Sequence, residues 1–396
     1  MRVTNSFVDF YDERGIIPVN QRDAATIQHY LRRKRLYGSL GIPMEHLSGL
    51  NILEVGGGSG DNAQIVLGFN PQRYVFLDSS KTALERLNSR FAREINHGTV
   101  QLLHGDMNNF ESHEKFDLVI AEGCIPGQVD PINALKNIVR LVSQSGYLIF
   151  TVQSAASLLS EILRRILALQ IRNYSNDEQE WVEDCITMFS STLVELKGMS
   201  RLFQDWVFDV LIHPWHHGSQ VFEFNSAYSL LNRDFELLGI SPSWVVRDSW
   251  YKEDTGEISI LQSRAFETYG LTSPFFLDRN FSAASATTVR VEDSEEIARI
   301  SHRIYEVHLQ SSQSQYVTKN QLEIIFDYIV ELSKLIRPYN SELAITLSEF
   351  LTISSELSLS YDRTRDYFIG TNFLKWWGRG QQYCAYQRAN GASMIT

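Results

Sequence analysis

A glycine-rich turn between an apolar run and a helical pattern is the feature that most constrains the fold of this chain. Ile52 and Leu53 lead into the stretch Glu54-Val55-Gly56-Gly57-Gly58-Ser59-Gly60, and residues 62–67 follow with a helical pattern. Glycine is needed where the backbone takes a positive φ or where a ligand approaches closely, and the first N–H groups of a helix lack partners within it. This order of strand, turn and helix predicts a site for a nucleotide-like ligand.

The spacing of the glycines differs from the fingerprint of dinucleotide-binding proteins. A G-x-G-x-x-G motif that starts at Gly56 needs glycine or alanine at position 61, where this chain has Asp61. A carboxylate at that place suits a pyrophosphate poorly, which weakens the hypothesis of an NAD-dependent oxidoreductase. The segment has the form E-x-G-x-G-x-G instead, and it resembles motif I of the class I S-adenosylmethionine-dependent methyltransferases.

Four further segments follow in the order that this resemblance requires. Strand patterns cover residues 73–78, 100–103, 116–123 and 146–152, and an amphipathic stretch at 131–142 precedes the last of them. Apolar runs of this kind are typical of strands that are buried on both faces of a parallel sheet. The resemblance implies an α/β fold with a Rossmann-like, doubly wound and mostly parallel sheet.

The resemblance also implies a cofactor, S-adenosylmethionine, with S-adenosylhomocysteine as its product. It places Asp78 on the ribose hydroxyls, Asp106 beside the adenine amino group and Met107 against the adenine ring. Local alternatives stay open, because Asp78 and Ser79 are also good helix caps and Asp106 also fits an ordinary turn. The implied cofactor-binding residues are Glu54, Gly56, Gly58, Gly60, Asp78, Ser79, Asp106, Met107 and Glu122.

Methyl transfer from a sulfonium is an in-line displacement that requires alignment and, for some acceptors, a general base. Glu122 follows the fourth strand, whose tip the resemblance places beside the reactive methyl group. His213, His216 and His217 form a cluster of imidazoles, which titrate near neutral pH. These four residues are the candidate catalytic residues.

The same three histidines could also hold a metal ion. No carboxylate pair lies near them in the sequence, and His spacing alone is weak evidence for a metal site. We therefore expect no metal ion in this protein.

The composition argues against several classes of partner. A formal net charge of −11 and the lack of a basic stripe disfavour a nucleic-acid substrate. Three widely separated cysteines suit reduced thiols, with Cys124 as a small buried residue. The chain start lacks the apolar core of a signal peptide, and no apolar run is long enough to cross a membrane. We expect a cytoplasmic protein with no membrane partner.

A chain of 396 residues exceeds what one hydrophobic core usually organises. We expect an N-terminal helical cap over residues 1–48, a methyltransferase core over 49–280 and a C-terminal helical domain over 289–396. The core carries an inserted helical lid at 153–224, which leaves the carboxyl end of the fifth strand, where ligands of open α/β sheets bind.

Charged and aromatic residues in these additions give further expectations. The basic run Arg32-Arg33-Lys34-Arg35 reads as a solvated helix face, and Arg164 and Arg165 lie opposite the apolar stripe of residues 154–171. The aromatic, glycine-rich stretch at 376–383 fits either a packed anchor or a substrate-facing segment.

We predict a methyltransferase that acts on an oxygen or nitrogen of a small metabolite, sugar or peptide. The alternative is a cofactor-binding pseudoenzyme that serves as an interaction module. The sequence leaves open the acceptor, the atom methylated, the use of a base, the role of the C-terminal helical region and the oligomeric state, with a homodimer among the alternatives.

Overall fold

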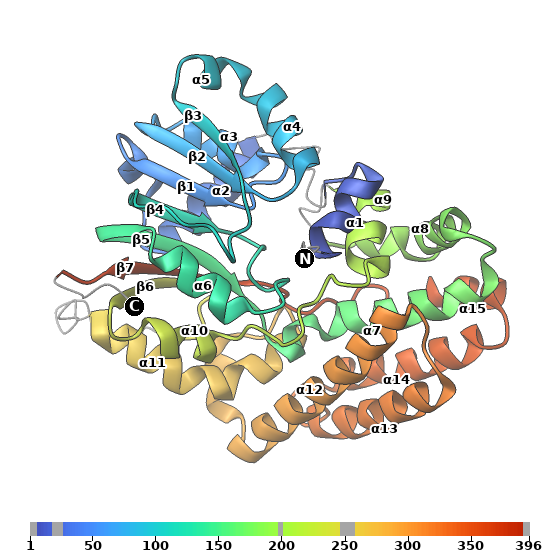
Figure 1. The fold of residues 1–396 in the computed structure, drawn as a ribbon. Helices are drawn as coiled ribbons and strands as arrows, with labels where there is room; N and C mark the ends of the chain where they lie inside the picture. The colour runs from blue at the N-terminus through green and yellow to red at the C-terminus, as the bar shows by residue number, and fades with distance from the viewer. Residues whose placement is uncertain (1–5, 18–26, 197–200, 246–257, 391–396) are drawn as a thin grey trace. The chain divides into compact units, whose positions relative to one another are not determined.

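The computed structural model describes residues 6–17, 27–196, 201–245 and 258–390 (Figure 1). The chain divides into two compact units, and each is described by itself. Unit 1 consists of Met1–Gln153, Gly218–Tyr269 and Gln381–Thr396, and unit 2 consists of Ser154–His217 and Gly270–Gly380. The chain therefore passes from unit 1 to unit 2 and back twice.

A seven-stranded sheet in the order β3-β2-β1-β4-β5-β7-β6 forms the centre of unit 1. Strands β1 to β5 pair in parallel, whereas β7 is antiparallel to both β5 and β6. The predicted fold class, a doubly wound and mostly parallel sheet, is confirmed. The strands are β1 Asn51–Val55, β2 Arg73–Asp78, β3 Val100–His104, β4 Phe116–Ala121, β5 Val142–Val152, β6 Phe235–Ser241 and β7 Gln382–Arg388.

Helices flank this sheet, and polar side chains begin several of them. Ser80 accepts a hydrogen bond from Ala83 N at 3.1 Å and so caps α4, and Asp130 caps α6, which has Pro131 in its first turn. The helices are α1 Ser6–Arg14, α2 Ile27–Ser39, η1 Met44–Leu47, α3 Asp61–Leu67, α4 Lys81–Arg90, α5 Ala92–Asn96, α6 Pro131–Val139, α10 Phe224–Leu231 and most of α11 Ile258–Thr272.

The described part of unit 2 is helical. The apolar stripe noted at 154–171 lies on the helix α7, and the helices α12 to α15 lie within the region 289–396 that we predicted to be helical. The elements are α7 Ala155–Ile171, η2 Arg172–Tyr174, α8 Glu178–Val194, α9 Phe203–Trp206, the π-helix η3 Val207–Ile212, η4 Ser273–Leu277, η5 Ala283–Thr288, α12 Val291–Ser314, α13 Lys319–Ile336, α14 Ser341–Leu357 and α15 Tyr361–Phe368. In the described parts of both units, none of the helices is long and apolar enough to span a bilayer.

The helix α7 is buried on nearly all sides, including the face opposite the apolar stripe where Arg164 and Arg165 lie. Every residue of α7 except Glu161 is buried. Arg164 Nη2 donates to the carbonyl oxygens of Phe373 and Trp376 at 2.9 and 2.8 Å. Buried carbonyl groups need donors, and these arginines supply them from inside unit 2. The two arginines opposite the apolar stripe therefore hold segments of unit 2 together from inside its core.

The C-terminal aromatic stretch is packed and leads into the sheet. The indole N–H of Trp376 donates to Leu277 O at 2.8 Å, and the guanidinium of Arg164 lies 4.3 Å from the ring centroid of Trp377. The next residues form β7, so the helical region that we predicted for 289–396 ends before Gln382. Of the two alternatives for this stretch, a packed anchor or a substrate-facing segment, residues 376–377 therefore form a packed anchor.

Tyr386 on β7 allows a test of how much this strand contributes to the stability of the folded protein. Its ring stacks on Phe150 of β5 with centroids 5.8 Å apart, and its buried hydroxyl has no hydrogen-bond partner in the described structure. We expect Tyr386→Ala to lower the free energy of unfolding by about 3–5 kcal/mol, the range for large aromatic truncations. Tyr386→Phe should leave it unchanged or raise it by about 1 kcal/mol, because an unsatisfied buried hydroxyl is removed. Urea denaturation measures both, and equal losses in the two variants would contradict this role of the ring.

Candidate functional site

The glycine turn is shaped by packing as well as by backbone conformation. Gly56 has φ +68°, and a Cβ there would lie 2.8 Å from the Cβ of Cys124. Gly60, the N-cap of α3, has φ +75°, and a Cβ there would lie 2.6 Å from the ring of Phe91. Both positions therefore exclude larger residues. At Gly58 a Cβ would meet only Ile17, at 3.8 Å, so this side of the turn is open as far as the described residues reach.

Asp78 joins the glycine turn to the end of β2. Its Oδ2 accepts a hydrogen bond from Gly58 N at 3.2 Å, and its Oδ1 accepts one from Ser80 N at 2.9 Å. Burial raises the pKa of Asp78 against these hydrogen bonds. Ser79, next to it, has its carbonyl oxygen 3.1 Å from His104 Nε2. Hydrogen bonds thus link the turn after β1 to the end of β2, and the 3.1 Å contact of His104 links the end of β2 to the end of β3.

The N-terminal helix α1 reaches the same region through a residue that sequence reasoning missed. Asp12 accepts hydrogen bonds from Ser80 Oγ at 2.6 Å, Lys81 N at 3.1 Å and Thr82 N at 3.2 Å. Burial raises the pKa of Asp12, but these hydrogen bonds outweigh it and the pKa is lowered. A carboxylate at a helix N-terminus satisfies N–H groups that lack partners. No motif around Asp12 marks this role in the sequence.

Asp106 and Met107 follow β3, and both are partly buried. Asp106 Oδ1 accepts hydrogen bonds from the backbone N and the side-chain Nδ2 of Asn108 at 2.9 and 2.8 Å. Asn108 Nδ2 also donates to Gln128 Oε1 at 2.8 Å. Asp106 therefore takes the turn geometry that the sequence left open. Its Oδ2 makes no hydrogen bond within the described residues, so it can still accept one from an amino group.

A buried ion pair occupies the tip of β4. Arg33 of α2 donates to both carboxylate oxygens of Glu122, from Nη2 to Oε1 at 2.5 Å and from Nη1 to Oε2 at 2.8 Å. Asn62 Nδ2 lies 3.3 Å from Oε2. Burial lowers the pKa of Arg33, but the charge of Glu122 outweighs it and the pKa is raised.

Arg33 was expected on a solvated face, and that expectation is wrong. His29, Arg33 and Tyr37 stand one helical turn apart on the buried side of α2. Both oxygens of Glu122 accept hydrogen bonds from the guanidinium, so an acceptor substrate would have to displace part of this contact to reach the carboxylate.

Glu54, the first residue of the motif, points into the core beneath the turn. Tyr74 Oη donates to Glu54 Oε2 at 2.6 Å, and the residue is buried. Burial raises the pKa of Glu54 to about 8, against the hydrogen bond from Tyr74. Its carboxyl group is thus held in the protonated form over much of the neutral range.

The three candidate histidines belong to unit 2. His213 Nδ1 accepts a hydrogen bond from Trp215 N at 3.0 Å, and His216 and His217 come together with Glu161 of α7. Burial lowers the pKa of His217 far below the usual range, and burial raises that of Glu161. The sequence brought these histidines together but gave no sign of the carboxylate.

Residues 53–148, which span β1 to β5, match a family model described as a methyltransferase domain. Unit 1 contains a class I methyltransferase domain. The resemblance noted for the glycine motif is thereby confirmed, and the methyl donor of this superfamily is S-adenosylmethionine. The open side of Gly58 and the carboxylate of Asp78 fit the ribose end of such a cofactor.

The search of solved structures finds matches to methyltransferases. N-methyltransferase NodS from Bradyrhizobium japonicum, in complex with S-adenosyl-L-homocysteine, is 21% identical over 38% of this chain and 75% of its own, with a TM-score of 0.31. A methyltransferase from Clostridium acetobutylicum is 18% identical over 39% of this chain and 59% of its own, with a TM-score of 0.28. The search of curated proteins finds no match.

The raised pKa of Glu54 makes the stability of the methyltransferase domain depend on pH. Its folded pKa of about 8 lies above the usual 4.5, so the folded state keeps a proton that the unfolded chain releases. The stability that this proton gives is present below pH 4.5 and is lost as pH rises toward 8, by about 1.4 kcal/mol per pH unit at most.

Glu54→Gln replaces the protonated acid with a neutral group of the same shape and should remove this loss. We expect the variant and the parent to unfold alike near the lower end of the window, and the variant to be more stable by a few kcal/mol above its upper end. Urea denaturation across pH measures the difference. Glu85→Gln, at an exposed position on α4, is the control and should show no such trend. A pH-independent difference for Glu54→Gln would contradict the raised pKa.

Proposed function

We propose that this protein transfers a methyl group from S-adenosylmethionine to an oxygen or nitrogen of a small metabolite, sugar or peptide. The observation that carries the proposal is the hydrogen bond from Gly58 N to Asp78 Oδ2, which joins the glycine turn and the ribose-binding acid at one edge of the sheet. That edge holds the carboxyl ends of β1 and β2, beside the point where the strand order reverses between β1 and β4. Ligands of doubly wound sheets bind at such a point.

Each residue at this edge has a role that its contacts support. Asp78 receives the ribose hydroxyls while its backbone partners Gly58 and Ser80 fix its orientation. Asp106 offers Oδ2 to the adenine amino group, held in place by Asn108. Met107 packs against the ring. The bound sulfonium supplies the electrophilic methyl carbon, and the chain supplies alignment and exclusion of water.

The Arg33–Glu122 pair favours alignment over base catalysis within unit 1. For Glu122 to take a proton from the acceptor, it would have to give up a buried bidentate contact, which leaves a guanidinium without its partner. We assign Glu122 to the positioning of α2 and α3 around the site. An acceptor that arrives with a lone pair available, such as a neutral amine, needs no base.

Cofactor binding is tested first, by calorimetry with S-adenosylhomocysteine. Asp78→Ala should weaken binding by roughly 1–3 kcal/mol, or about five- to 150-fold, because hydrogen bonds to a charged group are lost. Asp78→Asn, which keeps one acceptor oxygen, should lie between this variant and the parent. Glu85→Ala on the exposed face of α4 is the control. Unchanged affinity in Asp78→Ala, or preferential binding of NADH, would refute the assignment.

Methyl transfer is tested with S-adenosylmethionine labelled in its methyl group and a cell extract separated into metabolite, peptide and nucleic-acid fractions. We expect label in the metabolite or peptide fraction and none in nucleic acid, in keeping with the net charge of −11. Asp78→Ala should lose the transfer and Glu85→Ala should keep it. Tight binding of S-adenosylhomocysteine without label in any fraction would support the alternative, a cofactor-binding pseudoenzyme.

A further inference from the structure

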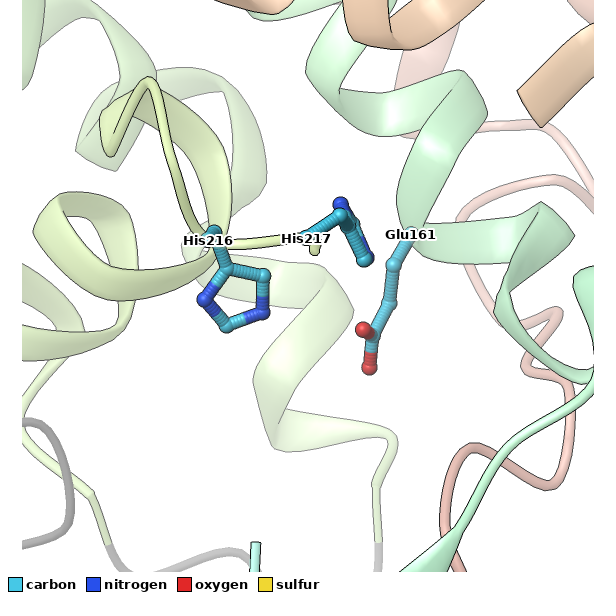
Figure 2. A group of neighbouring side chains, drawn as sticks. All are labelled: Glu161, His216 and His217. Atoms are coloured by element: carbon cyan, nitrogen blue, oxygen red, sulfur yellow. The ribbon is translucent and has the colours of Figure 1, made fainter. Parts of the chain in front are cut away.

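Three side chains of unit 2 that can bind metal ions lie together (Figure 2). One ligand atom each of Glu161, His216 and His217 lies within 4.8 Å of the other two. Glu161 comes from α7, and the two histidines come from the loop that follows η3. None of these atoms belongs to the cofactor edge of unit 1, so the cluster calls for an explanation of its own.

His216 is oriented by a carboxylate. Its Nδ1 lies 3.0 Å from Asp209 Oδ1, and Asp209 also forms an ion pair with Arg201. A carboxylate only accepts hydrogen bonds, so the ring carries its proton on Nδ1 and leaves a lone pair on Nε2. Histidines that bind metals are commonly oriented in this way.

His217 is oriented by a second imidazole. Its Nδ1 lies 3.1 Å from His308 Nε2, and its Nε2 is buried with no hydrogen-bond partner in the described structure. Only 8% of the surface of His217 is exposed. If Nδ1–H donates to His308, a bare lone pair remains on a nitrogen that water does not reach. An unpaired buried polar atom is costly, and a bound cation would satisfy it.

Glu161 completes the set. It is the one residue of α7 that is only partly buried, whereas the rest of the helix is fully enclosed. Its carboxylate accepts no hydrogen bond and forms no ion pair within the described residues. A carboxylate with no hydrogen bond or ion pair of its own, placed beside two imidazole lone pairs, is well placed to bind a cation.

The loop that carries the histidines is held firmly from α7 and α12. Arg165 Nη2 donates to His213 O at 2.6 Å, and Ser312 Oγ donates to Pro214 O at 3.2 Å. His308 lies on α12 and is fully buried. The histidines are therefore positioned before any ligand arrives, which reduces the cost of binding.

We infer that Glu161, His216 and His217 bind a divalent transition-metal ion, with Zn²⁺ the best fit, through one carboxylate oxygen and the Nε2 atoms of the two imidazoles. Two histidines and a carboxylate are a known ligand set for Zn²⁺. Ligand atoms around a tetrahedral Zn²⁺ lie about 3.4 Å apart, so the cluster must close by roughly an ångström. Three protein ligands leave one position open for water or another small ligand.

A metal ion bound at this cluster contradicts our expectation from the sequence that the histidines hold no metal. That expectation rested on the lack of a nearby carboxylate pair in the sequence. The fold supplies one carboxylate as a ligand, from a distant helix, and a second, Asp209, that orients His216. The site is independent of the proposed methyl transfer.

The test uses the full chain without a histidine tag, because a tag would itself bind the metal. The parent protein is dialysed against Zn²⁺ and then against metal-free buffer. It should retain about one Zn²⁺ per chain, measured by inductively coupled plasma mass spectrometry. His216→Ala, His217→Ala and Glu161→Gln should each lower the Zn²⁺ affinity by at least about 100-fold in calorimetry, because each removes a ligand. Asp209→Asn should lower it by about 10–100-fold, the usual effect of losing an orienting partner.

Two matched variants control for residue type. His46→Ala removes an exposed histidine of unit 1, and Glu183→Gln alters an exposed carboxylate of α8. Both should bind Zn²⁺ as the parent does. The visible spectrum of the Co²⁺-loaded protein gives a second readout, with intense bands expected for a tetrahedral site in the parent and in both controls. A parent protein with no saturable binding of Zn²⁺ or Co²⁺, or full binding in Glu161→Gln and His217→Ala, would overturn the inference.

Discussion

The strand β7, which follows the second segment of unit 2, is the element on which the sheet of unit 1 depends. It lies between β5 and β6 and is antiparallel to both, so among the described strands β6 pairs with β7 alone. Each of the two segments of unit 2 is therefore preceded and followed in the sequence by a segment of unit 1. Pairing β5 with β7 requires residues far apart in the sequence to meet, and contacts of that kind slow folding. The sheet is complete only when the segment that follows unit 2 has paired with β5 and β6.

Both units contain buried arginines, and in both the guanidinium N–H groups donate hydrogen bonds to oxygen atoms of the protein. Arg33 pairs with Glu122 in unit 1, whereas Arg164 and Arg165 donate to backbone carbonyls in unit 2. A buried cation is tolerated only when its donors are satisfied, and each guanidinium offers several donors in a fixed plane. These residues orient the elements around them more than they add stability, because the cost of desolvation offsets much of the attraction.

The sequence was informative wherever one segment carried its own pattern. The apolar runs of β1, β2 and β4 and the glycine turn identified the methyltransferase fold, because buried parallel strands and positive φ angles restrict residue choice locally. The strand β7 was missed, since the stretch Gln382-Tyr383-Cys384-Ala385 mixes polar and apolar residues and gains its strand form from its neighbours. Arg33 and Asp12 were missed for a related reason: each has a role set by a partner distant in sequence, Glu122 and Ser80.

Along the helix α7, the constraint that packing places on the sequence can be told apart from the constraint that chemical function places on it. All of its residues but one are enclosed, so related sequences can vary there only as far as shape and volume allow. Position 161 is outside that restriction, and packing gives no reason to keep glutamate in preference to glutamine, lysine or serine. Along α7 we therefore expect related chains to vary within the limits of packing at the apolar positions, of hydrogen bonding at Arg164 and Arg165, and of chemistry at Glu161.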